Sequence, residues 1–471
     1  MDLSSYLQSR GYGVVSNNFR SMIDLWASWY RGKVDSFHCY KVYNGRNSIS
    51  CTRLTLGMAK KVCEDWAGLL VNEKVKITLG GQREQDFLDK VLKENNFLVK
   101  ANEAQEKKAA YGTMAYVPYL ENATADSRGM ITGGNIRINY IPAMGIWPLA
   151  WDDTGISECA FATSLTRTRA GKAQSYCYVQ MHIKDNAGNY VIENLMFLDN
   201  SGNLQQVDLA EVEGYESVSP RIETNSTHRR FVIDRMNICN NVEEGCPLGI
   251  AVYANAIDVL KAVDTVFDSY NNEFVLGKRR IMVKEEALRE EMDGSRVYDP
   301  NDLTFYQIPG DATDQKIIEP IDVAIRAAEH ETAMQNRLNL LSSVVGLGDR
   351  YYRFDAGGVA TATQVISENS NLFRTLKKHE IIVDRAFKEL TAIILTMGKE
   401  TTDPSLDPDV EITIDFVDSI IEDKQAEYQR DREMVSMGVM RLEEFRAKYL
   451  NEDIEKARQN LPEAQQIVEG W

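Results

Sequence analysis

The spacing of apolar and polar positions predicts two long helices in the middle of the chain, joined by a short β segment. From residue 252 to residue 276, apolar side chains recur every three or four positions, which places them on one side of a helix. The residues on that side are Ala256, Val259, Leu260, Val263, Val266, Phe267, Tyr270 and Phe274. Gly277 is expected to end this helix. Pro320 is expected to begin a returning helix over residues 320–345, because proline is tolerated in a first turn.

The segment between the two helices, residues 277–319, predicts short strands at Arg280–Lys284 and 303–308, with a Pro309-Gly310 turn after the second. Along the returning helix the apolar side rotates by about a quarter turn from Met334 onward. Two interpretations remain open. The helices form either a projecting stalk with a β module at its end or a helical hairpin inside a globular core.

The pattern of apolar positions before residue 252 predicts helices first and strands afterwards. Helices are expected over 18–32, 53–71, 85–94 and 97–110, and a strand over 75–79. From residue 111 to residue 240 the apolar positions alternate with polar ones and glycine-bearing turns recur. This stretch predicts an antiparallel meander or sandwich.

The residues after the stalk begin with a loop, 346–358, that has glycines at both ends. Its centre holds three aromatic rings and two guanidinium groups in five consecutive positions, namely Arg350, Tyr351, Tyr352, Arg353 and Phe354. A long helix is expected over 361–397 and a strand over 411–417. Two charged helices, over 423–437 and 442–469, are expected to follow, with the second broken at Pro462.

Charge and composition limit the classes of function. The 471 residues carry a net charge of −17, so tight and general binding of DNA through phosphate contacts is not expected. No apolar run approaches the roughly 18 residues that cross a bilayer, and residues 1–19 lack the apolar core of a secretory signal. The seven cysteines form no Cys-x-x-Cys pair, so free thiols in a reducing compartment are expected.

The motifs of common enzyme classes are missing from the sequence. No Gly-Lys pair is followed by Ser or Thr as a phosphate-binding loop requires, and no Gly-x-Ser-x-Gly elbow occurs. His379-Glu380 begins a zinc-protease string, but Val383 occupies the position of its second histidine. We therefore expect no catalytic residue, no cofactor and no metal site.

Several segments, in the same order over nearly the whole chain, resemble the portal proteins of tailed bacteriophages of the siphophage kind. These segments are Trp26-Ala-Ser-Trp-Tyr-Arg-Gly32, Asp65-Trp-Ala-Gly-Leu-Leu-Val-Asn-Glu-Lys-Val-Lys-Ile77, Pro247-Leu-Gly249, Ala356-Gly-Gly-Val-Ala-Thr-Ala-Thr363 and Ile412-Thr-Ile-Asp-Phe-Val-Asp-Ser-Ile-Ile-Glu-Asp423.

The resemblance implies an α+β chain with a mostly helical portal fold. Residues 1–251 would form the wing, 252–276 and 320–345 the stem, and 277–319 the clip. Residues 346–358 would be the tunnel loop, 359–400 a long wing helix, and 401–471 a C-terminal strand followed by the helices of the crown.

The resemblance also implies function and partners. Portals of this kind form a ring of about twelve subunits at one capsid vertex of the virion, after assembly in the host cytoplasm. Double-stranded DNA passes through the channel without sequence specificity, and no membrane is involved. The ring contacts the major capsid and scaffold proteins, the terminase large subunit and later the head–tail connector or adaptor.

Candidate residues follow from this assignment. Arg350 to Phe354 are candidates for the tunnel loop, and Lys278, Arg279 and Arg280 are candidates in the clip. Residues Asp258, Asp264 and Asp268 are expected to line the channel, where acidic side chains would let DNA slide. Two alternatives stay open: another structural phage head protein, such as a minor head or scaffold component, and a metal-dependent DNA-processing enzyme.

Overall fold

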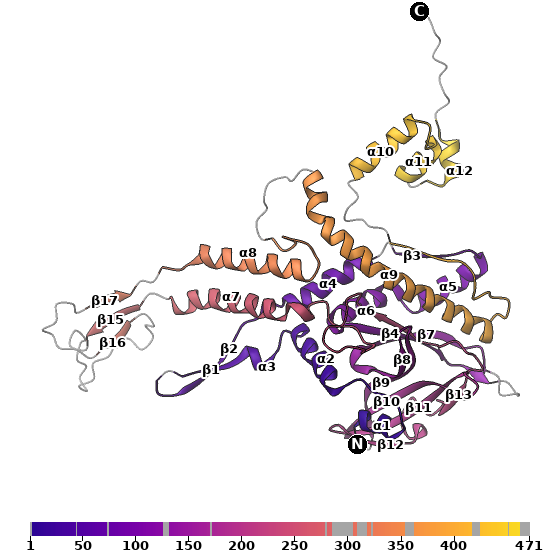
Figure 1. Cartoon of the computed structure of the whole chain (residues 1–471), viewed down its shortest axis with the longest axis horizontal. Helices are drawn as coiled ribbons and strands as arrows, with labels where there is room; N and C mark the ends of the chain where they lie inside the picture. The colour runs from indigo at the N-terminus through magenta and orange to yellow at the C-terminus, as the bar shows by residue number, and fades with distance from the viewer. Residues whose placement is uncertain are drawn as a thin grey trace, which may run out of the picture. The chain divides into compact units, whose positions relative to one another are not determined.

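The computed structural model divides the chain into two compact units. One unit comprises Met1–Ala356 with Arg374–Phe416, and the other comprises Gly357–Phe373 with Val417–Trp471. Within each unit, the structure describes some of the residues and not others. The structure describes residues 2–43, 45–72, 75–125, 131–169, 172–277, 280–284, 305–308, 318–321, 324–353, 362–416, 424–450 and 452–461. Helices and strands are both abundant, so the predicted α+β class is confirmed (Figure 1).

The N-terminal part of the first unit is helical. Its helices are α1 (Leu3–Ser9), α2 (Asn17–Tyr30), α3 (Asp35–His38), α4 (Met58–Leu70), α5 (Gln82–Glu94) and α6 (Phe97–Tyr111). The hydroxyl of Ser16 accepts the backbone N–H of Phe19 and so caps α2. Trp26 and Trp66 are fully buried, so the aromatic residues of these helices build the core. The strands β1 (Cys39–Tyr43) and β2 (Ser48–Thr52) were not predicted and form a hairpin.

The predicted β region is an antiparallel meander, as the alternating pattern indicated. Its main sheet has the order β12-β11-β10-β9-β8, with β13 on β11, and a second sheet has the order β14-β4-β7. The strands are β4 (Thr113–Glu121), β5 (Thr124–Ala125), β6 (Ile131–Thr132), β7 (Asn135–Pro142), β8 (Ile146–Asp152), β9 (Gly155–Arg169), β10 (Lys172–Lys184), β11 (Tyr190–Asn200), β12 (Asn203–Val207), β13 (Arg221–Glu223) and β14 (Val232–Arg235).

A buried ion pair joins α6 to this second sheet. Lys108 Nζ lies 2.9 Å from Asp234 Oδ1, and both side chains are at most 1% exposed. Gln105 donates to the other oxygen of Asp234 at 2.7 Å, and the hydroxyl of Tyr116 donates to it at 3.3 Å. The network fixes helix and sheet together, because a buried charge without a partner would be strongly destabilising.

One long helix and one strand return to the first unit from the C-terminal side. Helix α9 (Ala362–Thr401) matches the predicted long helix closely, and Phe387 and Ile394 on it are fully buried. Strand β18 (Ile412–Asp415) pairs antiparallel with β3 (Lys76–Leu79). Both strands were predicted, but their pairing was not.

The second unit contains a small helical group: α10 (Lys424–Ser436), α11 (Leu442–Leu450) and α12 (Ile454–Gln459). The carboxylate of Asp431 accepts Lys448 Nζ at 2.6 Å and the hydroxyl of Tyr449 at 2.9 Å, which ties α10 to α11. The prediction of one helix as far as Pro462 was wrong. The helix ends at Leu450, and Asp453 caps a new helix by accepting the N–H of Glu455. Among the described helices, none has the length and apolarity needed to cross a membrane.

Candidate functional site

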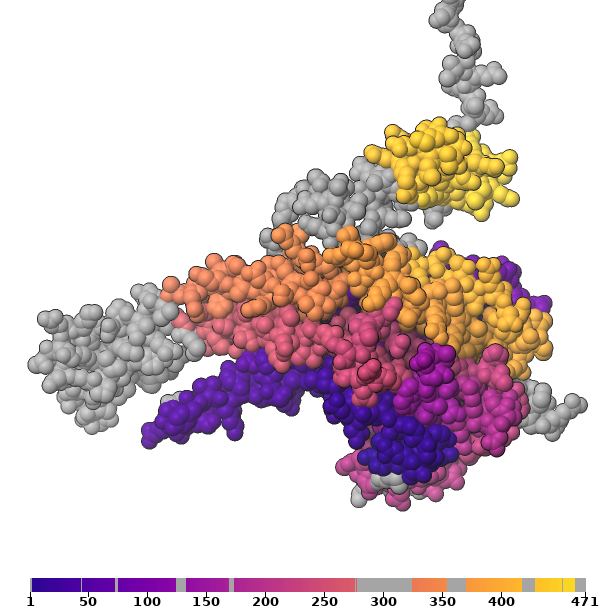
Figure 2. Space-filling view, in the orientation of Figure 1, coloured from indigo at the N-terminus to yellow at the C-terminus, as the bar shows by residue number. Residues whose placement is uncertain are grey.

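The predicted pair of long helices exists, and we call this pair the stem. Helix α7 (Ile257–Leu276) packs along α8 (Ala327–Val344), and Figures 1 and 2 show the pair extending away from the sheets of the first unit. Near the end of α7, Glu273 forms ion pairs with Arg326 and, at 3.4 Å, with His330. The ring of Tyr270 stacks on the ring of His330 at 5.4 Å between centroids. The stalk interpretation, rather than a hairpin inside the core, fits this arrangement.

The second helix begins at Ala327 and not at Pro320 as predicted. Residues Ile318–Ile321 form the strand β17, which pairs antiparallel with β15 (Arg280–Lys284), while β16 (Phe305–Ile308) pairs with the other side of β15 in parallel. Strand β17 lies at the edge of this sheet, where a proline without an N–H is tolerated. The predicted first part of the helix, before Ala327, is therefore not helical, so its apolar side cannot be compared with that of α8.

One of the three clip candidates lies at the start of this small sheet. Arg280 is the first residue of β15. Lys278 and Arg279 lie outside the described residues, so their assignment to the clip stays a prediction.

The three acidic candidates on α7 have different environments. Asp258 has a side chain that is 94% exposed and pairs with Lys261 at 2.9 Å. In contrast, Asp264 and Asp268 are 3% and 8% exposed. Their carboxylates accept hydrogen bonds from within the chain, so the expectation that both face a water-filled channel does not fit their burial.

The buried carboxylates hold the segment that follows the β1–β2 hairpin. Oδ1 of Asp264 accepts the N–H of Leu56 at 2.8 Å, and Oδ1 of Asp268, one turn later, accepts the N–H of Leu54 at 3.0 Å. Oδ2 of Asp264 lies 3.1 Å from His38 Nε2. Since His38 Nδ1 accepts the N–H of Val34, Nε2 carries the proton of the neutral ring and donates it to Asp264.

We call the contacts of His38, Leu54 and Leu56 with Asp264 and Asp268 the stem clamp. Sequence reasoning missed it because an aspartate on the polar side of a helix is usually solvated, and its partners lie more than 200 positions earlier in the chain. The only local signal was the spacing of the two aspartates, four residues apart on one side of the helix.

The tunnel-loop candidates divide into one anchored tyrosine and more exposed neighbours. The hydroxyl of Tyr352 donates to Asp65 of α4 at 2.9 Å, and Gln335 of α8 donates to the Tyr352 carbonyl at 2.7 Å. Burial beside Asp65 raises the pKa of Tyr352 far above its ordinary value. Arg350, Tyr351 and Arg353 are exposed, and Phe354 lies outside the described residues.

The loop backbone uses the freedom that its first glycines provide. Gly346 and Gly348 have φ values of +81° and +84°, and Arg350 also has a positive φ of +64°. A non-glycine residue in this region is uncommon. Part of the loop is therefore held in a defined conformation and is not a loose connection.

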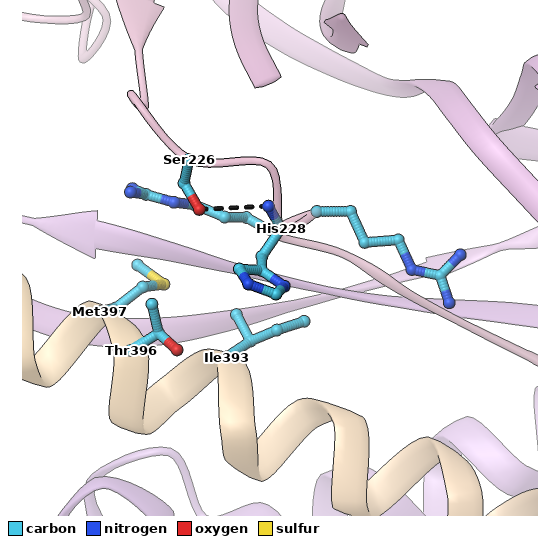
Figure 3. Close-up of a pocket in the computed structure, with 7 residues that line it drawn as sticks. Ser226, His228, Ile393, Thr396 and Met397 are labelled. Carbon is cyan, nitrogen blue, oxygen red and sulfur yellow. Dashed lines mark hydrogen bonds between the residues drawn. The ribbon is translucent and has the colours of Figure 1, made fainter. Parts of the chain in front are cut away.

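A small pocket lies where the segment 226–230 crosses α9, with Ile393, Thr396 and Met397 beneath it (Figure 3). The pocket has a volume of about 20 Å³, which is enough for one water molecule. Arg229 pairs with Glu389 at 2.7 Å between Nε and Oε1, and Arg230 pairs with Glu400 at 2.5 Å. These arginines are thus used in fixing α9 to the sheet.

The described part of the chain offers few side-chain groups that could form a metal site. Within it, no group of three or more His, Cys, Asp or Glu side chains is arranged to hold a metal ion.

Comparison with known proteins gives the family. Residues 15–470 match the family model described as phage portal protein, SPP1 Gp6-like. No curated protein matches the chain. Because the match covers nearly the whole length, from just before α2 to residue 470, this chain belongs to the SPP1 Gp6-like family of phage portal proteins.

Proposed function

We propose that copies of this chain assemble into a closed ring at one vertex of the capsid, and that the ring is the channel for DNA packaging and ejection. The observation that supports this most is the α7–α8 stem, in a chain that matches a portal family over residues 15–470. The stem projects from the first unit and leads directly into the small sheet β15–β17.

The surface of the stem supports assembly. Four large apolar side chains on it are between 47% and 50% exposed: Phe274 and Val275 on α7, and Leu340 and Val344 on α8. They form two pairs, one near the end of α7 and one near the end of α8, and exposed apolar side chains close to one another often mark a contact with another protein. A head-to-tail contact between identical subunits closes into a ring when its rotation divides the circle.

The side chains available to line a channel are the exposed ones. Asp258 offers a carboxylate that repels phosphate, while Arg350 of the proposed tunnel loop offers a guanidinium group that attracts it. Together they would allow DNA to pass without being held. The clip around β15 is the proposed docking surface for the terminase and later for the connector, and the C-terminal helices are the proposed crown.

The test is assembly of heads from defined components. The full chain is co-expressed with the major capsid and scaffold proteins, and the heads are then supplied with terminase, ATP and double-stranded DNA. We expect one ring per head and DNA that resists nuclease, whereas heads assembled without this chain should protect none. Equal protection of DNA in both samples would contradict the proposed channel.

A further inference from the structure

The β1–β2 hairpin, residues 39–52, is a two-stranded arm with one uncovered apolar face. Its register pairs Val42 with Ile49 and Tyr40 with Cys51. Cross-strand partners and alternate residues share a face of a sheet, so these four side chains lie together. Val42 and Ile49 are 45% and 47% exposed. The opposite face carries Lys41, Ser48, Ser50 and Thr52 in addition to Cys39 and Tyr43.

Such an arm is incomplete by itself. A two-stranded hairpin is at best marginally stable in water unless its apolar face is covered. Figure 2 shows the arm standing out from the body of the first unit. Its base, in contrast, is held firmly, because the stem clamp fixes residues 54 and 56 to α7. The structure thus positions the arm rigidly at its base and leaves its apolar face open.

The arm and α8 lie on opposite sides of α7. The clamp contacts Asp264 and Asp268, whereas α8 contacts Tyr270 and Glu273. At about 100° per residue, these two pairs point about 170° apart around the helix axis. Each chain therefore presents an apolar arm on one side of its stem and the exposed Leu340 and Val344 of α8 on the other. Two different patches on two sides are what a head-to-tail contact between identical copies needs.

The charges of the arm also favour a second copy of this chain as the partner of its apolar face. The arm, residues 39–52, contains Lys41 and Arg46 and no Asp or Glu, in a chain whose net charge is −17. A second copy is therefore an acidic partner for a basic arm. Exposed Glu329 and Glu331 on α8 add to this complementarity.

We propose that the arm of one subunit packs its Val42–Ile49 face on the α8 surface around Leu340 and Val344 of the next subunit. This inference rests on the proposed ring and names the surface that would close it. The arm then acts as a strap between neighbouring stems, and the clamp transmits its position to α7.

The first test replaces the apolar face and keeps a matched control. The double variant Val42→Asp/Ile49→Asp puts two charges on the proposed contact face, and Ser48→Asp/Ser50→Asp puts two charges on the opposite face of the same strands. We expect the first variant to need at least tenfold more protein for half assembly, measured by native mass spectrometry, and the second to stay within twofold of the wild type.

The second test does not depend on mutant stability. Variants Ile49→Cys/Val344→Cys and Ser50→Cys/Val344→Cys are treated with a short bismaleimide, with each single variant as reference for the native thiols. We expect a ladder of covalently linked subunits from the first pair and much less from the second. A linked product of monomer size only would mean that the arm folds onto its own stem, which overturns the inference.

The remaining outcomes separate the inference from the proposed function. Wild-type rings, together with undiminished assembly of Val42→Asp/Ile49→Asp and no ladder, would overturn the arm contact and leave the ring standing. Failure of the wild type to form rings would overturn both. Protection of the arm from hydrogen exchange only after double-stranded DNA is added would identify a nucleic acid as its occupant and would also overturn the inference.

Discussion

At the scale of single residues, buried polar groups explain most of what holds the stem. Asp264 accepts two hydrogen bonds while it is 3% exposed, and its removal would leave the N–H of Leu56 and Nε2–H of His38 without an acceptor. The sequence could show an aspartate on a helix but not these partners, because they come from a distant segment. Burial is decided by the fold of the whole unit, and a pattern of neighbours in sequence cannot report it.

The stem clamp gives a prediction about stability. Asp264→Ala should lower the free energy of unfolding by about 2–4 kcal/mol, since two buried donors lose their acceptor. Asp258→Ala, at an exposed position of the same helix, should stay within about 0.5 kcal/mol of the wild type. Urea denaturation followed by tryptophan fluorescence, at one protein concentration, measures both. Equal midpoints for the two variants would contradict the clamp.

Buried His182 gives a prediction about pH. Its ring packs against those of Phe161 and Phe231, and burial lowers its pKa to about 3. Because the unfolded chain then binds a proton below about pH 6.5 that the folded chain does not bind, stability falls as the pH falls from 6.5 towards 3. This histidine alone should cost about 2 kcal/mol between pH 6.5 and pH 5.

The variant His182→Gln tests this slope. Its stability should depend less on pH over this window than that of the wild type, whatever its absolute value at pH 7. His228→Gln, at an exposed histidine, is the matched control and should keep the wild-type slope. Thermal melting points at pH 5, 6 and 7 measure the slope. Parallel curves for all three proteins would show that His182 is not kept neutral by the fold.

At the scale of elements, periodicity predicted existence and type better than boundaries. The helices α2, α6, α7 and α9 were predicted because each buries one broad side, and that side is visible in the spacing. The β1–β2 hairpin was missed because its segment, which is largely exposed on both faces, has few strongly apolar positions. The start of α8 was misplaced because Pro320 suits a first helical turn as well as an edge strand.

In the proposed tunnel loop, Tyr352 anchors the loop to α4, and the exposed Arg350 and Tyr351 are the candidates for contact with DNA. Tyr352→Phe removes a hydrogen bond to Asp65 and should cost about 1 kcal/mol of stability, without changing how much DNA a head packages. The double variant Arg350→Ala/Tyr351→Ala removes exposed groups and should leave rings intact and shorten the packaged DNA. Ring yield by electron microscopy and DNA length by gel distinguish them. Full-length DNA with the double variant would exclude these side chains from translocation.

At the scale of the whole molecule, the described elements form two units with different contents. The first unit combines the sheets, the stem and the part of α9 from Arg374 onward, and the second holds the beginning of α9 and the small C-terminal helices. Family membership was predicted from the sequence and is confirmed, because short segments in a fixed order survive as a pattern. The order from wing to crown stays a prediction. The surfaces that join subunits could not be predicted, since exposure is a property of the folded chain.

We propose that the chain forms a ring around an axial channel. The most direct measurement is electron microscopy of the purified full-length protein, with class averages viewed along the axis. We expect closed rings with a central hole, and side views in which the stems run along that axis. Monomers, twofold dimers or open filaments at every protein concentration and salt concentration tried would contradict it.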